Sequence, residues 1–111
     1  MEDAITRRND LAATIEAVTG KGSVSTDPAS RALFSQDVWA KGETALAVVR
    51  PESQEAVAAL LPVLAAEGLA AFPRGGGMSY TKGYTPDRPG VVVDLTALNR
   101  IVEINADDMY V

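Results

Sequence analysis

Cysteine and histidine are both absent from this sequence of 111 residues. Their absence excludes disulfides, thiolate nucleophiles, Ser–His or Cys–His catalytic pairs, and zinc sites built from these ligands. No acid–base or substrate-binding residues can be placed within the chain either, so we expect no catalytic residue, and we expect no metal site. We also expect these 111 residues alone to be inactive.

An excess of positive charge is also lacking, because 15 acidic residues outnumber 10 basic ones and the net charge is −5. Proteins that bind the nucleic-acid backbone usually present a basic face, so no nucleic-acid partner is expected. No apolar run approaches the ~20 residues that span a bilayer, and the charged N-terminus lacks the apolar core of a signal peptide. We therefore expect a cytoplasmic location.

What is present is the composition of a folded domain, with 47% hydrophobic and 23% charged residues. Apolar spacing and turn signals predict helices over residues 10–20, 28–35 and 53–68, and strands over residues 45–50, 69–72, 91–93 and 101–104. Pro62 lies inside the third helix and predicts a kink or break near residues 58–61. This order favours an α+β fold, a small mixed sheet of three to four strands backed by helices.

The last three residues, 109–111, read as the beginning of an apolar strand that the sequence does not finish. A strand needs a neighbour for its backbone hydrogen bonds, so we expect the chain to be a fragment. The same unpaired strand supports a second interpretation. In it the chain is a non-catalytic interaction module, a homo-oligomer formed through this edge.

The most informative segment is the loop from Phe72 to Gly83, which contains three consecutive glycines. Glycine lets backbone N–H groups approach a ligand with no Cβ in between, and successive N–H groups form a concave anion site. Residues 72–90 hold three cations and one carboxylate in an otherwise acidic chain. This chemistry suits a phosphate or pyrophosphate, and the alternative is a flexible surface loop that binds nothing.

Two familiar phosphate-binding loops are excluded by spacing. A Walker A loop needs Gly-Lys followed by Ser or Thr, whereas Lys82 precedes Gly83 here. A Rossmann fingerprint needs a third glycine where Tyr80 stands, and a helix where residues 84–90 are rich in proline.

Three segments in this order carry a family resemblance: AVVRPES at 47–53, FPRGGGMS at 72–79 and GVVVDLTALNRI at 90–101. Together they resemble the FAD-binding domain of the vanillyl-alcohol oxidase/p-cresol methylhydroxylase type, especially FAD-linked oxidases of the glycolate oxidase subunit and D-lactate dehydrogenase kind. The resemblance covers about residues 24–111, including the lead-in at 34–37. It implies a helical lead-in over residues 1–44 and the first of two FAD-binding subdomains over 45–111, truncated at its C-terminal end.

The resemblance also implies a role for the glycine loop, whose backbone N–H groups would hold the pyrophosphate of FAD. The cofactor-binding residues implied are Pro73, Arg74, Gly75, Gly76, Gly77, Met78, Ser79 and Gly83. Met78 departs from the family, where non-covalent members usually carry Thr and flavin-tethering members carry His. Since His and Cys are absent, we expect the FAD to be non-covalent as far as this segment is concerned.

The function implied is that of a flavin-dependent oxidoreductase that oxidises a 2-hydroxy acid or similar small alcohol. The substrate would bind through the rest of a longer parent chain.

Other polar and aromatic residues have two interpretations each. We expect Trp39 to anchor the N-terminal helices rather than to face a flavin or a partner. Tyr80 and Tyr84 either stack on the cofactor or cover the loop. We expect Asp94 and Asn99 to cap a turn, and the acidic pair at 107–108 to be solvated.

Overall fold

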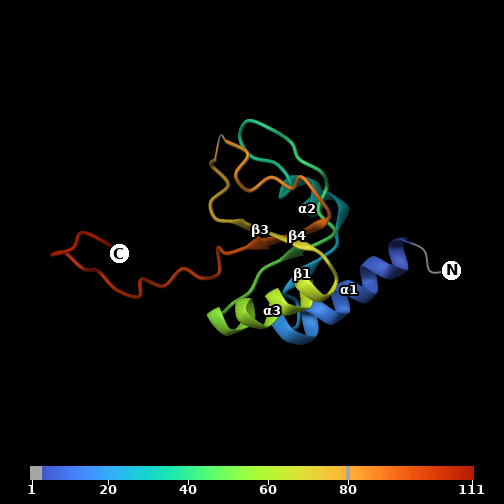
Figure 1. Cartoon of the computed structure of the whole chain (residues 1–111), viewed down its shortest axis with the longest axis horizontal. Helices are drawn as coiled ribbons and strands as arrows, with labels where there is room; N and C mark the ends of the chain where they lie inside the picture. The colour runs from blue at the N-terminus through green and yellow to red at the C-terminus, as the bar shows by residue number, and fades with distance from the viewer. Residues whose placement is uncertain (1–3, 80) are drawn as a thin grey trace.

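The computed structural model describes residues 4–79 and 81–111. Its elements are α1 (Ala4–Thr19), β1 (Val24–Ser25), α2 (Pro28–Leu33), β2 (Val48–Val49), α3 (Gln54–Ala66), β3 (Ala70–Arg74) and β4 (Gly90–Asp94). Figure 1 shows them gathered into one body, from which the C-terminal segment extends as an arm. Among the described residues, none of the helices combines the length and the apolar character needed to cross a membrane.

The strands form one mixed sheet in the order β1-β2-β4-β3. Both β2 and β3 run parallel to β4, and β1 pairs antiparallel with β2. Every residue of β4 is buried, because its valine run lies between two neighbouring strands and is covered on both faces. The predicted α+β class with a mixed sheet backed by helices is confirmed.

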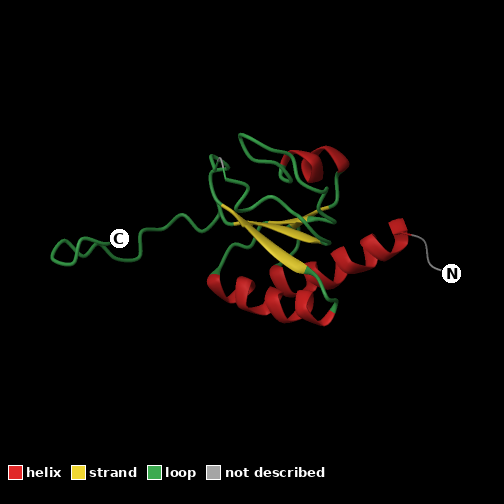
Figure 2. Ribbon diagram, turned by 45° about the horizontal axis from the view of Figure 1, so that its top comes forward, coloured by secondary structure: helices red, strands yellow, loops and turns green. Residues whose placement is uncertain are grey.

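The two faces of the sheet carry different layers. Figure 2 shows α1 and α3 on one face and α2 with its neighbouring loops on the other. Successive strand residues point to opposite faces, so Val91 and Val93 pack beneath α1 and α3 while Val92 faces the loop side. The larger core consists of Ile15, Ala47, Val49, Leu60, Leu64, Val91 and Val93. The smaller one consists of Ala45, Val48 and Val92, with Phe34 and Phe72 packed against it.

Helix α3 runs without interruption through Pro62, so the predicted break is wrong. Ser53 caps the helix by accepting a hydrogen bond from the Ala56 N–H at 3.1 Å. Pro62 removes the bond to the carbonyl of Ala58, but both residues lie on the exposed side of the helix. Water can therefore hydrate that carbonyl, and the buried residues on the opposite side hold the helix against the sheet.

The C-terminal arm differs from the prediction. The expected strand at 101–104 does not form, and the side chains of Ile101, Val102 and Ile104 are exposed. The predicted strand at 109–111 is also absent, since Tyr110 pairs back with Asn105 in an isolated bridge. A strand requires a neighbouring strand, and within the described residues the arm has none. The arm lies away from the sheet (Figure 1).

The division into a lead-in of residues 1–44 and a subdomain of residues 45–111 stays a prediction. In the structure α1 supplies Ile15 to the larger core, and β1 completes one edge of the sheet.

Candidate cofactor-binding loop

The glycine loop begins where β3 ends, at the carboxyl edge of the sheet. Arg74 is the last residue of β3 and lies opposite Asp94, the last residue of β4. Because the two strands are parallel, the chain must return along the sheet to Gly90 before β4 can begin. Residues 75–79 and 81–83 therefore project beyond the carboxyl ends of the strands, where ligands of open parallel sheets commonly bind.

Gly75 and Gly76 are open to their surroundings. A Cβ added to either residue would find no atom of the described residues within 4 Å, and neither residue has a positive φ. By contrast, a Cβ on Gly42 would lie 2.5 Å from the Pro86 carbonyl oxygen. The fold of the described chain therefore requires glycine at position 42 but not at 75 or 76.

The backbone donors of the same segment are also free. Within the described residues, the N–H groups of Gly75, Gly76, Gly77 and Met78 donate no hydrogen bond to the rest of the chain. Four successive free donors beside two open glycines are the features that an anion-binding loop needs. This part of the site fits the diphosphate of a nucleotide cofactor.

The Arg74 side chain is directed into the protein. Its Nη1 donates a hydrogen bond of 2.6 Å to the Gln36 carbonyl, and its guanidinium lies 5.0 Å from the Phe34 ring centroid and 5.1 Å from that of Tyr84. Gly77 is needed above it, because its φ is +77° and a Cβ there would lie 2.5 Å from Arg74 Nη2. The guanidinium thus packs against the loop from within the protein, between Phe34 and Tyr84.

A second segment, residues 36–41, backs the loop. The Val38 N–H donates to the Ser79 carbonyl at 3.3 Å, and the Lys82 N–H donates to Asp37 Oδ2 at 2.8 Å. Asp37 Oδ1 accepts two further hydrogen bonds, from Trp39 N at 2.7 Å and Ala40 N at 2.6 Å. Desolvation alone would raise the pKa of Asp37, but the three backbone donors and the positive charge of Lys82 outweigh it and hold this pKa below its ordinary value.

The remaining predicted loop residues take different positions. Met78 is 68% exposed, Gly83 is exposed, and Pro73 lies in β3 opposite Val93. Ser79 Oγ accepts a hydrogen bond of 3.3 Å from the Thr81 N–H, so its hydroxyl is used within the loop. The structure therefore brings the predicted residues to one edge but gives the Arg74 and Ser79 side chains partners in the protein.

The aromatic residues near the loop differ in how their positions compare with the predicted roles. Tyr84 lies beneath the loop against Arg74, and its hydroxyl is buried with no hydrogen-bond partner among the described residues. This position favours the covering role for Tyr84. Tyr80 lies outside the described residues. The prediction that Trp39 anchors the helices is wrong, because its side chain is 76% exposed on the segment that backs the glycine loop.

Four polar residues follow the loop in the sequence, and the turn-capping role predicted for two of them can be compared with the structure. Asp94 Oδ1 accepts hydrogen bonds from the N–H of Thr96 at 3.0 Å and from its hydroxyl at 2.7 Å, which confirms the turn-capping role of Asp94. Asn99 is exposed, and so are Asp107 and Asp108.

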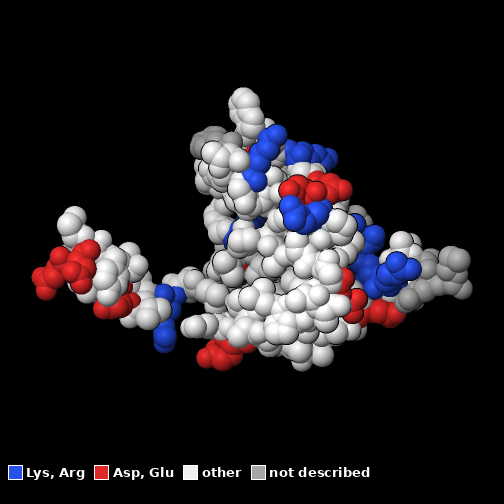
Figure 3. Space-filling view, in the orientation of Figure 1, with Lys and Arg blue, Asp and Glu red and all other residues white. Residues whose placement is uncertain are grey.

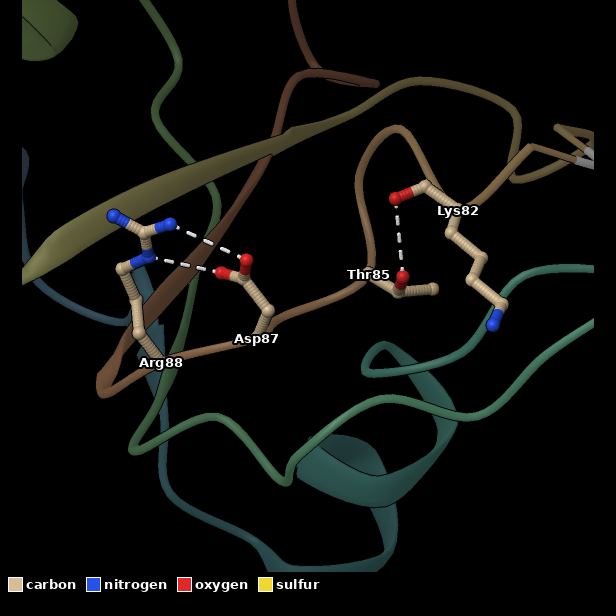
Figure 4. Close-up of polar contacts among 4 residues, drawn as sticks. All are labelled: Lys82, Thr85, Asp87 and Arg88. Carbon is tan, nitrogen blue, oxygen red and sulfur yellow. Dashed lines mark hydrogen bonds and ion pairs between the residues drawn. The ribbon is translucent and has the colours of Figure 1, made fainter.

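The positive charges of the loop region are not all available to a ligand. Arg74 is held by the protein, and Arg88 forms an ion pair with Asp87 at 2.9 Å (Figure 4). The hydrogen bond from Arg88 lowers the pKa of Asp87. The Lys82 ammonium forms no ion pair with any described residue, although its backbone carbonyl accepts a hydrogen bond from Thr85 (Figure 4).

The wider charge distribution agrees with this picture. Figure 3 shows basic and acidic atoms side by side over the loops at the top of the molecule, and acidic atoms at the far end of the C-terminal arm. Two clefts of about 610 and 640 Å³ lie elsewhere, one between α1 and Leu69 and the other between the start of α3 and residues 97–102. The glycine loop lines neither of these clefts and stands on an open rim of the sheet.

The chain belongs to a family of FAD-binding domains, because the pattern of the family described as "FAD binding domain" matches residues 45–111. The resemblance inferred from the sequence is thus confirmed, and FAD is the cofactor of this family.

Solved structures share the fold. With p-cresol methylhydroxylase with substrate bound, the TM-score is 0.71 at 17% identity, over 87% of this chain and 20% of that one. With alkyldihydroxyacetonephosphate synthase the TM-score is 0.74 at 17% identity, over 89% and 21%. With 4-ethylphenol oxidase from Gulosibacter chungangensis in its isoeugenol complex it is 0.68 at 21% identity, over 95% and 21%. The chain spans about a fifth of the length of each of these proteins.

Proposed function

We propose that this chain is the part of a flavin-dependent oxidoreductase that holds the FAD pyrophosphate, and that the loop of residues 74–79 is its cradle. The observation that carries the proposal is the run of free backbone N–H groups from Gly75 to Met78 beside two glycines with open space around them. The fold of the described residues does not require glycine at positions 75 and 76. A ligand that approaches the backbone closely would require it.

The chemistry of the loop matches a diphosphate better than a neutral ligand. Successive backbone N–H groups present partial positive charge, and an anion bound there gains charge-assisted hydrogen bonds. The Lys82 ammonium adds a cation that forms no ion pair within the described residues. The loop also lies beyond the carboxyl ends of β3 and β4, the edge at which ligands of open parallel sheets commonly bind.

Bound FAD would supply the redox chemistry, and the residues described here would bind and orient it. The substrate that we propose, a 2-hydroxy acid or similar small alcohol, rests on the sequence resemblance to FAD-linked oxidases of the glycolate oxidase subunit kind. A cytoplasmic location and a non-covalent flavin are also part of the proposal. We propose that this segment binds the flavin non-covalently because the chain contains no His or Cys.

Self-association is the second candidate function. It no longer rests on the strand predicted at 109–111, which does not form, but on exposed apolar side chains of the C-terminal arm. The apolar side chains of Ile101, Val102 and Ile104 are 68%, 84% and 71% exposed on the C-terminal arm. Exposed apolar residues in one short segment are typical of a surface that another body covers. Sedimentation over a range of concentrations tests this candidate, and a monomer at every concentration contradicts it.

The test of the pyrophosphate cradle is Gly76→Asp in the whole protein in which this chain occurs. A Cβ and a carboxylate at this position would meet the phosphates rather than the protein, so we expect the variant to fold and to lose bound FAD. Ala29→Asp is the matched control, because it adds the same charge at an exposed position in the first turn of α2.

The readouts are the visible absorbance of protein-bound flavin and the far-UV circular dichroism. Equal flavin content in Gly76→Asp and wild type would refute the cradle. Gly76→Ala separates the two causes, since it adds the Cβ without the charge.

A further inference from the structure

The Asp37 side chain joins two segments that lie 45 residues apart in the sequence. Its Oδ2 accepts the Lys82 N–H at 2.8 Å, while its Oδ1 accepts the N–H groups of Trp39 and Ala40. The carboxylate therefore folds the 36–41 turn and, with its second oxygen, holds the far end of the glycine loop to that turn.

Among the described residues, three hydrogen bonds connect the 36–41 segment to the loop, and they are spread along the length of the loop. Arg74 donates to the Gln36 carbonyl at the start, Val38 N–H donates to the Ser79 carbonyl in the middle, and Asp37 accepts from Lys82 at the end. The free N–H groups of residues 75–78 lie between the first two contacts. Their directions in space are thus set by a segment outside the loop.

The last contact also holds an unfavourable backbone conformation. Lys82 has a φ of +61°, in the left-handed region that residues with a Cβ rarely adopt. An acceptor fixed opposite its N–H group compensates for this conformation. Without the carboxylate, Lys82 would relax toward negative φ and the end of the loop would move.

We propose that Asp37 is a positioning residue for the FAD pyrophosphate, an inference that rests on the proposed function of the loop. Asp37 does not touch the cofactor in this scheme. It keeps the loop in the conformation that presents its N–H groups together, so that little conformational freedom is lost when the diphosphate binds. The depressed pKa of Asp37 is consistent with an ionised acceptor at neutral pH.

The experiment measures FAD affinity of the whole protein by quenching of flavin fluorescence, in wild type, Asp37→Asn and Asp87→Asn. An amide at 37 cannot accept from both sides, because one of its two terminal atoms is a donor. We expect the Kd for FAD to rise about tenfold in Asp37→Asn. Asp87 is the matched control, an exposed aspartate of the same region that pairs with Arg88, and its variant should bind FAD as wild type does.

A rescue variant separates positioning from general destabilisation. Lys82→Gly makes the left-handed conformation favourable without any acceptor, and it also removes the ammonium, so the single variant Lys82→Gly is the reference for the double variant. We expect Asp37→Asn to weaken FAD binding about tenfold in wild type and much less in the Lys82→Gly background. An equal loss in both backgrounds is the result for a carboxylate that only stabilises the 36–41 turn, and it overturns the positioning role.

The remaining outcomes are distinguishable. If Asp37→Asn binds FAD as tightly as wild type while Gly76→Asp loses it, the role of Asp37 is refuted and the cradle stands. If Gly76→Asp retains FAD, the cradle fails and the role of Asp37 fails with it. If Asp37→Asn does not fold, amide hydrogen exchange of wild type decides. A Lys82 N–H protected before FAD is added supports the inference, and one that exchanges as fast as an unstructured amide overturns it.

Discussion

Arg74 offers the sharpest test of how the glycine loop is built. The family resemblance places Arg74 in the pyrophosphate loop, whereas the structure directs its guanidinium beneath the loop, between Phe34 and Tyr84. A residue that only contacts the ligand has no effect on the stability of the FAD-free protein. A residue that supports the loop from within the protein does.

The magnitude follows from the contacts that Arg74→Met removes. A hydrogen bond from a charged donor contributes about 1.5–3 kcal/mol, and each cation–π contact about 0.5–1 kcal/mol at a partly exposed site. Arg74 is half-buried, and methionine retains much of the packing of its aliphatic stem. We therefore take the low end for the hydrogen bond and the two cation–π contacts, and expect the free energy of unfolding to fall by about 2.5 kcal/mol.

The assay is urea denaturation of the FAD-free protein followed by far-UV circular dichroism, with the slope of the transition unchanged. Arg88→Met is the control, because it removes an exposed guanidinium whose ion pair with Asp87 contributes little, about 0–1 kcal/mol. If Arg74→Met unfolds within about 0.5 kcal/mol of wild type, Arg74 does not support the loop and the reasoning fails.

Three further predictions concern the framework of the loop. Gly90→Ala should destabilise the protein by about 3 kcal/mol or fail to fold, because its Cβ would collide with the Ala70 carbonyl of the neighbouring strand, and equal thermal stability would refute this packing. Pro62→Ala should raise the free energy of unfolding by about 1–3 kcal/mol, since it restores a helix hydrogen bond at an exposed position; a lower value in urea denaturation would contradict this. The pKa of Asp37 is lower in the folded protein than the value of about 3.9 in the unfolded chain, so the ionised carboxylate stabilises the fold above that pH. Acidification from about pH 5 should progressively remove this stabilisation, because the carboxylate becomes protonated. Urea denaturation should therefore show wild type and Asp37→Asn converging in stability at low pH, and a constant difference would count against an ionised Asp37.

Much of the fold follows from local sequence signals. The valine run at 91–93 predicts the buried central strand, Ser53 and Asp27 predict helix starts that the structure confirms, and the glycine triplet predicts an open loop. These signals succeed because capping, β-branching and glycine act over a few residues. The strand β1 was not predicted, because its two residues are too few to show any alternation of apolar and polar side chains.

The strand predicted at 101–104 failed for a non-local reason. Its residues are apolar, but a strand exists only where a second strand offers hydrogen bonds, and periodicity cannot supply that neighbour. The break predicted at Pro62 failed similarly, because packing of Leu60 and Leu64 against the sheet compensates for the lost hydrogen bond.

The family, the α+β class and the loop that we assign to FAD could therefore be predicted from the order of residues along the chain, since each depends on residue types in a short, ordered pattern. The contacts that hold this loop could be seen only in the folded chain. Folding directed the Arg74 guanidinium into the protein, left Trp39 exposed, and brought Asp37 within a hydrogen bond of Lys82. The Arg74–Gln36 contact joins residues that are 38 positions apart in the sequence, and the Lys82–Asp37 contact joins residues that are 45 positions apart. Such contacts depend on how the strands are ordered in the sheet, and no local pattern in the chain encodes that order.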